Sequence, residues 1–323
     1  MRKNISITLI TCFAVVMSSA QSDDYLHYHR ETIRAEKMII NGSYQQALET
    51  YQALIEQFPF VFLRDQKIAT QLAWKLGKEH AAFDILQQAI TNGWKKKSIK
   101  RNSFLKPMRQ HPRWELLMVH YDSMTSIYEN RLDHQLRAEV RSMSLRDQRK
   151  AMGALLKFGS KAQDKYGEEK FARHNEKHLL RLIEIIQQQG YPGEKLIGYD
   201  PWAQGIFSRH NSISQAYCKK DTLYAYTKPL LKQALIKGEM NPADHAYIQD
   251  WFISVKSGWS TSFYGSIGQL KKEELTEANS RRQEIGLRPV HLRNQLIDLQ
   301  ENLGMNFYLP MFPGKNVKIN VAL

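Results

Sequence analysis

Gly42-Ser43-Tyr44-Gln45-Gln46-Ala47 is followed, thirty-five residues later, by the related stretch Gly77-Lys78-Glu79-His80-Ala81-Ala82. Each stretch has a glycine suited to a tight turn and then a helix whose small alanine lets a partner helix approach closely. Breaks follow at Pro59 and at Asn92-Gly93. The pattern predicts two helical hairpins packed side by side over about residues 24–92, with Ala47 and Ala82 at helix contacts.

The period and the residue types resemble tetratricopeptide repeats. The resemblance implies a groove that binds a protein or peptide partner. Two repeats bury too little surface to be stable alone, so a neighbouring segment must cap them. Residues 92–128 are the expected cap, because Trp94, Leu105 and Trp114 stand where aromatic and leucine side chains would fill the last groove. We therefore assign residues 21–128 to a repeat array with a capping segment.

The first twenty residues have the order of a signal peptide. Arg2 and Lys3 precede an apolar run, and Ser18-Ser19-Ala20 supplies the small residues that a signal peptidase reads. We expect cleavage after Ala20 and a mature start at Gln21; a lipoprotein start at Cys12 is the alternative. No later apolar run is long enough to span a membrane. The protein is expected to be exported: periplasmic, secreted or associated with the cell envelope of a bacterium.

The composition is that of an ordinary folded protein. The chain has 323 residues, 42% of them hydrophobic, which argues against disorder and is enough for two domains. Two cysteines exclude a disulfide framework and a cysteine-rich metal cluster. Lysine and arginine number 46 against 32 acids, for a net charge of +14.

Part of the positive charge is concentrated between Trp94 and Trp114, a segment without acids. Basic residues interleaved with aromatic ones suit a polyanion backbone, so a polyanion binder through residues 94–114 is one hypothesis. The alternative is a solvated rim around a buried aromatic cap. Export argues against nucleic acid as the partner.

From about residue 132 the pattern changes to longer amphipathic helices. Leu179, Leu182, Ile183 and Ile186 form one apolar stripe, and Gly190 with Pro192 predicts where that helix ends. Further helices are predicted at about 222–237, 242–254 (with Asn241 as the cap) and 289–303. Residues 258–268 are expected to form a loop or short hairpin, and 301–323 a tail. The predicted class is therefore all-α.

Short motifs in this second part resemble the uncharacterised family named domain of unknown function 6624. The resemblance covers about residues 132–300. It is carried by Asp147-Gln148-Arg149, Gly190-Tyr191-Pro192, Ile197-Gly198, His210, Ala246-Tyr247-x2-Asp250, Tyr264-Gly265, Arg281-Arg282 and Gly286-Leu287. No activity is established for that family, so the resemblance implies a map of sites without a reaction. The sequence departs from its pattern at Asn175, His178, Arg209, Trp251 and Ser262, which predicts a copy that is divergent in activity or only binds.

The candidate catalytic residues are His210, Asp147 and Asp250, and the candidate ligand-binding residues are Tyr264, Arg281, Arg282 and Gln148. A histidine titrates near neutrality and serves as acid, base or ligand, and the two aspartates would orient it or hold a water. The alternative role of the aspartates is to form structural ion pairs with Arg149 and with Arg281 or Arg282. The alternative role of His210 is to fix a helix end through hydrogen bonds. Arg281 and Arg282 suit a carboxylate or phosphate. We predict that His210, Tyr264 and Arg282 lie near one another.

Two further features were weighed as sites. His174 and His178 lie four residues apart and share a helical face, as two metal ligands would. No cysteine or carboxylate motif completes the set in sequence, so we expect neither a metal nor a cofactor. Cys218 is expected to be a buried, unreactive thiol.

Three functional hypotheses follow. The first is an exported interaction module that binds a protein or peptide in its repeat groove. The second is a hydrolase-like enzyme with a site near His210, Asp147, Asp250, Tyr264 and Arg282. The third is the polyanion binder. The absence of a known nucleophile or metal motif favours the first.

Overall fold

A computed structural model describes residues 24–310 and 318–322. It confirms the all-α class, because helices account for most of this length and the strands are two residues each. The expected signal peptide, residues 1–20, and the expected start at Gln21 lie outside the described residues. Within the described ranges, no helix combines the length and the apolar character needed to cross a bilayer.

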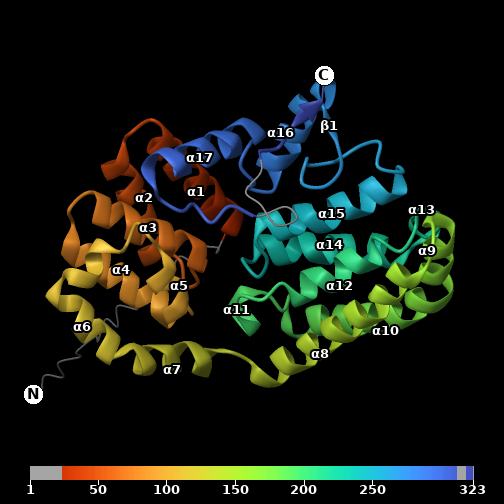
Figure 1. Cartoon of the computed structure of the whole chain (residues 1–323), viewed down its shortest axis with the longest axis horizontal. Helices are drawn as coiled ribbons and strands as arrows, with labels where there is room; N and C mark the ends of the chain where they lie inside the picture. The colour runs from red at the N-terminus through yellow and green to blue at the C-terminus, as the bar shows by residue number, and fades with distance from the viewer. Residues whose placement is uncertain (1–23, 311–317, 323) are drawn as a thin grey trace, which may run out of the picture.

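Two helical hairpins stand at the N-terminal end of the described chain (Figure 1). They consist of α1 (Tyr25–Ile40) with α2 (Tyr44–Gln57), and α3 (Leu63–Lys75) with α4 (Glu79–Thr91). Gly42 and Gly77 make the two turns at φ 77° and 69°, a conformation that favours glycine. Ala47 and Ala82 are fully buried, as the sequence predicts for helix contacts.

The capping segment closes this array with short helices. They are α5 (Lys96–Arg101), the 3₁₀ turn η1 (Pro107–Gln110), α6 (Pro112–Val119) and α7 (Tyr121–Arg131). Trp94, Leu105 and Met108 are fully buried, while Trp114 is half-buried. The Tyr121 hydroxyl donates to the carbonyl of Trp94 at 3.1 Å and fixes the end of the cap to its start.

The second part of the chain is built from helices around a separate core. They are α8 (His134–Ala151), η2 (Met152–Leu156), α9 (Ser160–Tyr166), η3 (Gly167–Phe171), α10 (Ala172–Gln189), α11 (Glu194–Ile197), α12 (Trp202–His210), α13 (Gln215–Lys220), α14 (Leu223–Ile236) and α15 (Pro242–Lys256). α10 ends at Gly190 with φ 92°. The Asn241 side chain caps α15 by accepting from the Asp244 amide at 2.9 Å. Both features match the sequence prediction.

The last part of the chain holds a short parallel strand pair and two helices. Strand β1 (Leu270–Lys271) pairs with β2 (Val321–Ala322), and between them lie η4 (Lys272–Glu274), α16 (Leu275–Glu284) and α17 (Val290–Leu303). Residues 258–268 form a loop, and the strand after it pairs with the end of the chain rather than within a hairpin.

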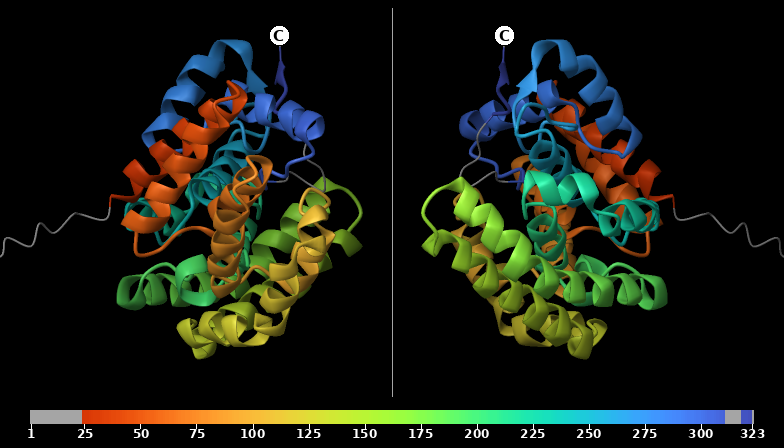
Figure 2. Two further views of the ribbon diagram at one scale, coloured as in Figure 1. Left: turned by 90° about the vertical axis from the view of Figure 1, so that its left-hand side faces the viewer. Right: turned by 90° about the vertical axis from the view of Figure 1, so that its right-hand side faces the viewer.

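The C-terminal end of the described chain packs into the first core. Figures 1 and 2 show α17 beside α1. Leu296, Met305 and Phe307 are fully buried among the side chains of the two hairpins. The Gln71 side chain of α3 also bonds to the Asn306 backbone through both its amide nitrogen, at 2.8 Å, and its oxygen, at 2.9 Å. The segment expected as a tail at 301–323 therefore packs, up to residue 310, as a structural part of the core of the two hairpins.

Candidate binding pocket between the two parts of the chain

A cavity of about 390 Å³ lies where the first hairpins, the second helical part and the C-terminal segment meet. Its walls come from α1, the start of α3, residues 191–204, residues 239–244, residues 286–288 and residues 306–310. This volume is typical of pockets that hold small organic molecules, which often form at such junctions.

Paired charges stabilise one wall of the pocket. Glu36 is fully buried and accepts from Arg288 at 2.7 and 2.9 Å, and it also pairs with Arg64. Arg64 in turn bonds to Asp65 at 2.8 Å, and the Tyr28 hydroxyl donates to the same carboxylate at 2.7 Å. Burial opposes the charge on Glu36, but Arg288 and Arg64 outweigh it and lower the pKa of this carboxyl. Two carboxylates thus neutralise two guanidinium groups.

A second group of carboxylates lines the pocket without ion pairs of this kind. Glu194 accepts from the Leu63 amide at 2.7 Å, Glu239 accepts from the Tyr191 amide at 2.9 Å, and Asp244 accepts from the Asn241 side chain at 2.7 Å. None of the three forms an ion pair with a lysine or arginine of the described residues. Burial raises the pKa of Glu194 to about 7 and that of Asp244 to about 6. The pocket therefore carries surplus negative charge above neutral pH.

Aromatic and unpaired polar groups complete the lining. Tyr199 is 63% exposed although it lines the pocket, so its ring is available for contact. His29 is buried, and its Nε2 has no hydrogen-bond partner among the described residues. Burial, with Arg288 and Arg64 nearby, lowers the pKa of His29 to about 3, so this imidazole is neutral.

A lysine beside the pocket is surrounded by aromatic rings. Lys67 Nζ lies 4.8 Å from the ring centroid of Tyr308, 5.6 Å from that of Tyr199 and 5.7 Å from that of Trp94. Burial lowers the pKa of Lys67 to about 8. The ammonium group is held on ring faces, and two of the three rings also line the pocket. This arrangement could not be predicted from the sequence, because its four residues are scattered from position 67 to position 308.

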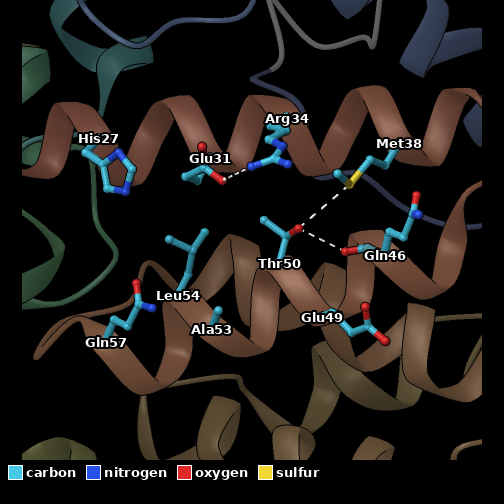
Figure 3. A pocket seen from close by; sticks show the side chains of 10 residues that line it. All are labelled: His27, Glu31, Arg34, Met38, Gln46, Glu49, Thr50, Ala53, Leu54 and Gln57. Atoms are coloured by element: carbon cyan, nitrogen blue, oxygen red, sulfur yellow. Dashed lines mark hydrogen bonds and ion pairs between the residues drawn. The ribbon is translucent and has the colours of Figure 1, made fainter.

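A second hollow, of about 730 Å³, lies on the outside of the first hairpin. Figure 3 shows His27, Glu31 and Arg34 of α1 on one side and side chains of α2 on the other. Its polar groups are largely bonded to one another: Arg34 pairs with Glu31 at 3.3 Å, and Thr50 donates to the Gln46 carbonyl at 2.9 Å. We regard it as an open surface groove, less suited to a small ligand than the enclosed pocket.

Four of the predicted site residues meet around the loop 263–267: Asp250, Tyr264, Arg282 and Arg281, which donates to the Phe263 carbonyl at 3.3 Å. The Asp250 carboxylate accepts from the backbone amides of four loop residues, including Tyr264 at 2.7 Å and Ser266 at 2.5 Å. Arg282 donates to the carbonyl of Tyr264 at 2.5 Å and to that of Arg288 at 2.7 Å. Burial raises the pKa of Asp250 to about 6. We interpret this group as the anchor of a loop, because the side chains bind backbone atoms.

His210 and Asp147 belong to another network. Asn175 donates to Asp147 Oδ2 at 2.6 Å, and its own oxygen lies 2.8 Å from His210 Nδ1. His210 Nε2 lies 3.2 Å from Asp221 Oδ1. Burial opposes charge on Asp221, but His210 and the amides of Tyr224 and Leu223 outweigh it and lower its pKa. His210 is fully buried, which supports a role in fixing the helices.

The proximity predicted for His210, Tyr264 and Arg282 is thus found directly for only one pair. Tyr264 and Arg282 are hydrogen-bonded, whereas His210 bonds within the Asp147 network. The structure also shows the contacts of residues that depart from the pattern of the resembled family. Asn175 and His178 both contact Asp147, and Arg209 donates to the Ser144 hydroxyl at 2.7 Å. Asn175 and His178 therefore belong to one network around Asp147, whereas Arg209 Nε and Trp251 Nε1 are buried without a hydrogen-bond partner among the described residues.

The remaining candidates lie apart from the pocket lining. Gln148 is exposed on α8, and Arg281 stacks on the Phe263 ring at 4.0 Å. Cys218 is buried, as the sequence predicts, and burial raises its pKa to about 12. In the basic segment five basic side chains are exposed: Lys95, Lys97, Lys100, Arg101 and Lys106.

Several motifs that carry the family resemblance converge on the pocket. Tyr191, Pro192, Gly198 and Gly286-Leu287 all line it, although they are far apart in the chain. Searches among known protein families, curated proteins and solved structures found no match to this chain. The resemblance therefore stays a prediction, and the argument for function is based on the geometry.

Proposed function

We propose that the protein binds a small organic cation, an amine or guanidine on an apolar body, in the pocket between its two parts. The observation that carries this proposal is the surplus of carboxylates: Glu194, Glu239 and Asp244 line the pocket without an ion pair to a lysine or arginine of the described residues, although Lys67 and Arg131 are near enough to act on Glu194. A bound cation would neutralise them, and the exposed ring of Tyr199 offers it a face. His29 Nε2 supplies one further hydrogen-bonding atom.

This proposal differs from the sequence prediction in the kind of ligand: a small molecule takes the place of a protein or peptide partner. Residues 304–310 lie against α3 of the second hairpin. The chain therefore fills with its own segment part of the surface that a peptide would need. The order of residues 1–20 supports a setting outside the cytoplasm.

Matched probes test the charge preference. 2-Phenylethylamine and 3-phenylpropanoate share a ring and a short chain and differ in the sign of charge. At pH 8 we expect the amine to raise the melting temperature, by the equivalent of about 2.7 kcal/mol at a hundredfold excess over its Kd. We expect no shift from the carboxylate. Equal shifts from both probes would overturn the proposal.

Two variants locate the binding. Tyr199→Ala should weaken binding of the amine about tenfold, because it removes the exposed aromatic face. Tyr226→Ala is the matched control: Tyr226 is 57% exposed on α14 and does not line the pocket. Calorimetric titration measures the affinity of both variants for 2-phenylethylamine. Equal affinity in the two variants would show that the amine binds outside this pocket.

A further inference from the structure

Three metal-ligating side chains meet between two helices that run side by side, α8 and α10 (Figure 1). Asp147 comes from α8, and His174 and His178 come from successive turns of α10. Their ligand atoms all lie within 4.8 Å of one another. The sequence offered the two histidines as a pair without a third ligand, and the packing of α8 supplies it.

The distances are close to those that a metal ion requires. Asp147 Oδ1 lies 2.7 Å from His178 Nδ1 and 3.5 Å from His174 Nε2. Ligands at about 2.0–2.1 Å from a tetrahedral zinc ion are roughly 3.3 Å apart. Side-chain adjustments of less than about 1 Å would therefore let all three reach one ion.

Hydrogen bonding alone explains only part of this cluster. The contact of His178 with Asp147 at 2.7 Å is a good hydrogen bond, so His178 is satisfied without a metal. His174 Nε2 is different: it is shielded from solvent and has no hydrogen-bond partner among the described residues. A buried nitrogen in this state is costly unless something binds it.

Surrounding groups hold the ligands as they do in metal centres. Asn175 fixes the second oxygen of Asp147, and His210 fixes Asn175. The His174 imidazole also bonds to the backbone of Arg146. Such outer contacts orient ligating side chains and are typical of metal sites. The His174 side chain is 31% exposed, which gives an ion a path from solvent.

We propose that Asp147, His174 and His178 bind one divalent transition-metal ion of the zinc class. Two imidazole nitrogens and one carboxylate oxygen suit zinc and cobalt better than magnesium or calcium, which prefer oxygen ligands. Three protein ligands leave a position for water, as in catalytic zinc centres. This site is separate from the pocket, so neither proposal depends on the other.

The test is a titration of the tag-free, chelator-treated protein with Zn²⁺. We expect uptake of one ion per chain and a rise in melting temperature. His174→Ala should lower the affinity more than about tenfold. His291→Ala, which removes an exposed histidine from α17, should bind as the parent does. Absence of uptake by the parent, or equal affinity in the parent and His174→Ala, would overturn the proposal.

Co²⁺ supplies a spectroscopic signal that the three side chains would not produce if their role were only structural. Co²⁺ bound by two imidazoles and a carboxylate should give a visible absorption band, which Zn²⁺ displaces. His178→Ala should lose the band, and circular dichroism shows whether this variant is folded. Because His174 is partly exposed, His174→Ala decides the question if His178→Ala does not fold. A band that persists in His174→Ala would assign the ion to other residues.

Discussion

Glu194 shows how one buried carboxyl links the pocket to pH. Its pKa is raised by burial to about 7, so the folded protein keeps the proton over a range in which the unfolded chain releases it. The contribution of protonated Glu194 to the free energy of unfolding is fully present below the ordinary pKa of about 4.5. This contribution is lost as the pH rises towards the raised pKa of about 7. If the pocket binds a cation as proposed, ionised Glu194 favours that binding and lowers the stability of the protein at high pH.

Glu194→Gln should therefore stabilise the protein at pH 8 and not at pH 4.5. Glutamine cannot ionise, and its oxygen can still accept from the Leu63 amide. We expect a gain of about 1–3 kcal/mol at pH 8, from the size of the pKa shift. Denaturant unfolding at the two pH values measures it, with the exposed Glu301→Gln as the control. A gain of the same size at both pH values would contradict this account.

The same variant also bears on the proposed ligand. If Glu194 contributes its charge to binding, Glu194→Gln should weaken binding of 2-phenylethylamine at pH 8, where the parent carboxylate is ionised. Stability and binding would then change in opposite directions. A merely structural residue would not produce that combination.

At the level of the helices, the sequence was most informative where the signal is local. The stop of α10 at Gly190 and the cap of α15 at Asn241 depend on residues next to the helix ends, so both could be predicted. The contact of Asp147 with His178 depends instead on the register between α8 and α10. No local pattern specifies that register, which is why the three-ligand cluster was missed.

The tight packing of the hairpin helices predicts that a larger side chain at Ala82 destabilises the protein. Ala82 is fully buried in the first core, so Ala82→Leu inserts three carbon atoms where space is lacking. We expect a loss of about 1–3 kcal/mol in the free energy of unfolding. Ala162→Leu, on the exposed side of α9, should have little effect. Similar unfolding midpoints for the two variants would show that Ala82 is not at a tight contact.

At the scale of the whole molecule, the first core is completed by the end of the chain. Composition and periodicity suggested that residues 301–323 form a separate tail, because nothing in Met305 or Phe307 reveals which distant surface they cover. The structure buries both among the hairpins. The pocket could not be predicted for the same reason, since its walls combine segments from α1 to residue 310.

Phe307→Ala should therefore destabilise the N-terminal hairpins although it lies far from them in sequence. Loss of a fully buried phenylalanine costs about 3–5 kcal/mol. Phe158 is 99% exposed, so Phe158→Ala serves as the matched control. Hydrogen exchange would show faster exchange in α3 for Phe307→Ala alone. Unchanged protection of α3 would separate the tail from the first core.

The burial of Phe307 in the first core also bears on how the protein is made. A ribosome releases the hairpins long before the segment around Phe307, because the two are far apart in sequence. Throughout that interval the nascent hairpins expose apolar side chains that this later segment will cover, and such surfaces attract one another between chains. The first core of a growing chain therefore stays incompletely folded until the residues around Phe307 have emerged.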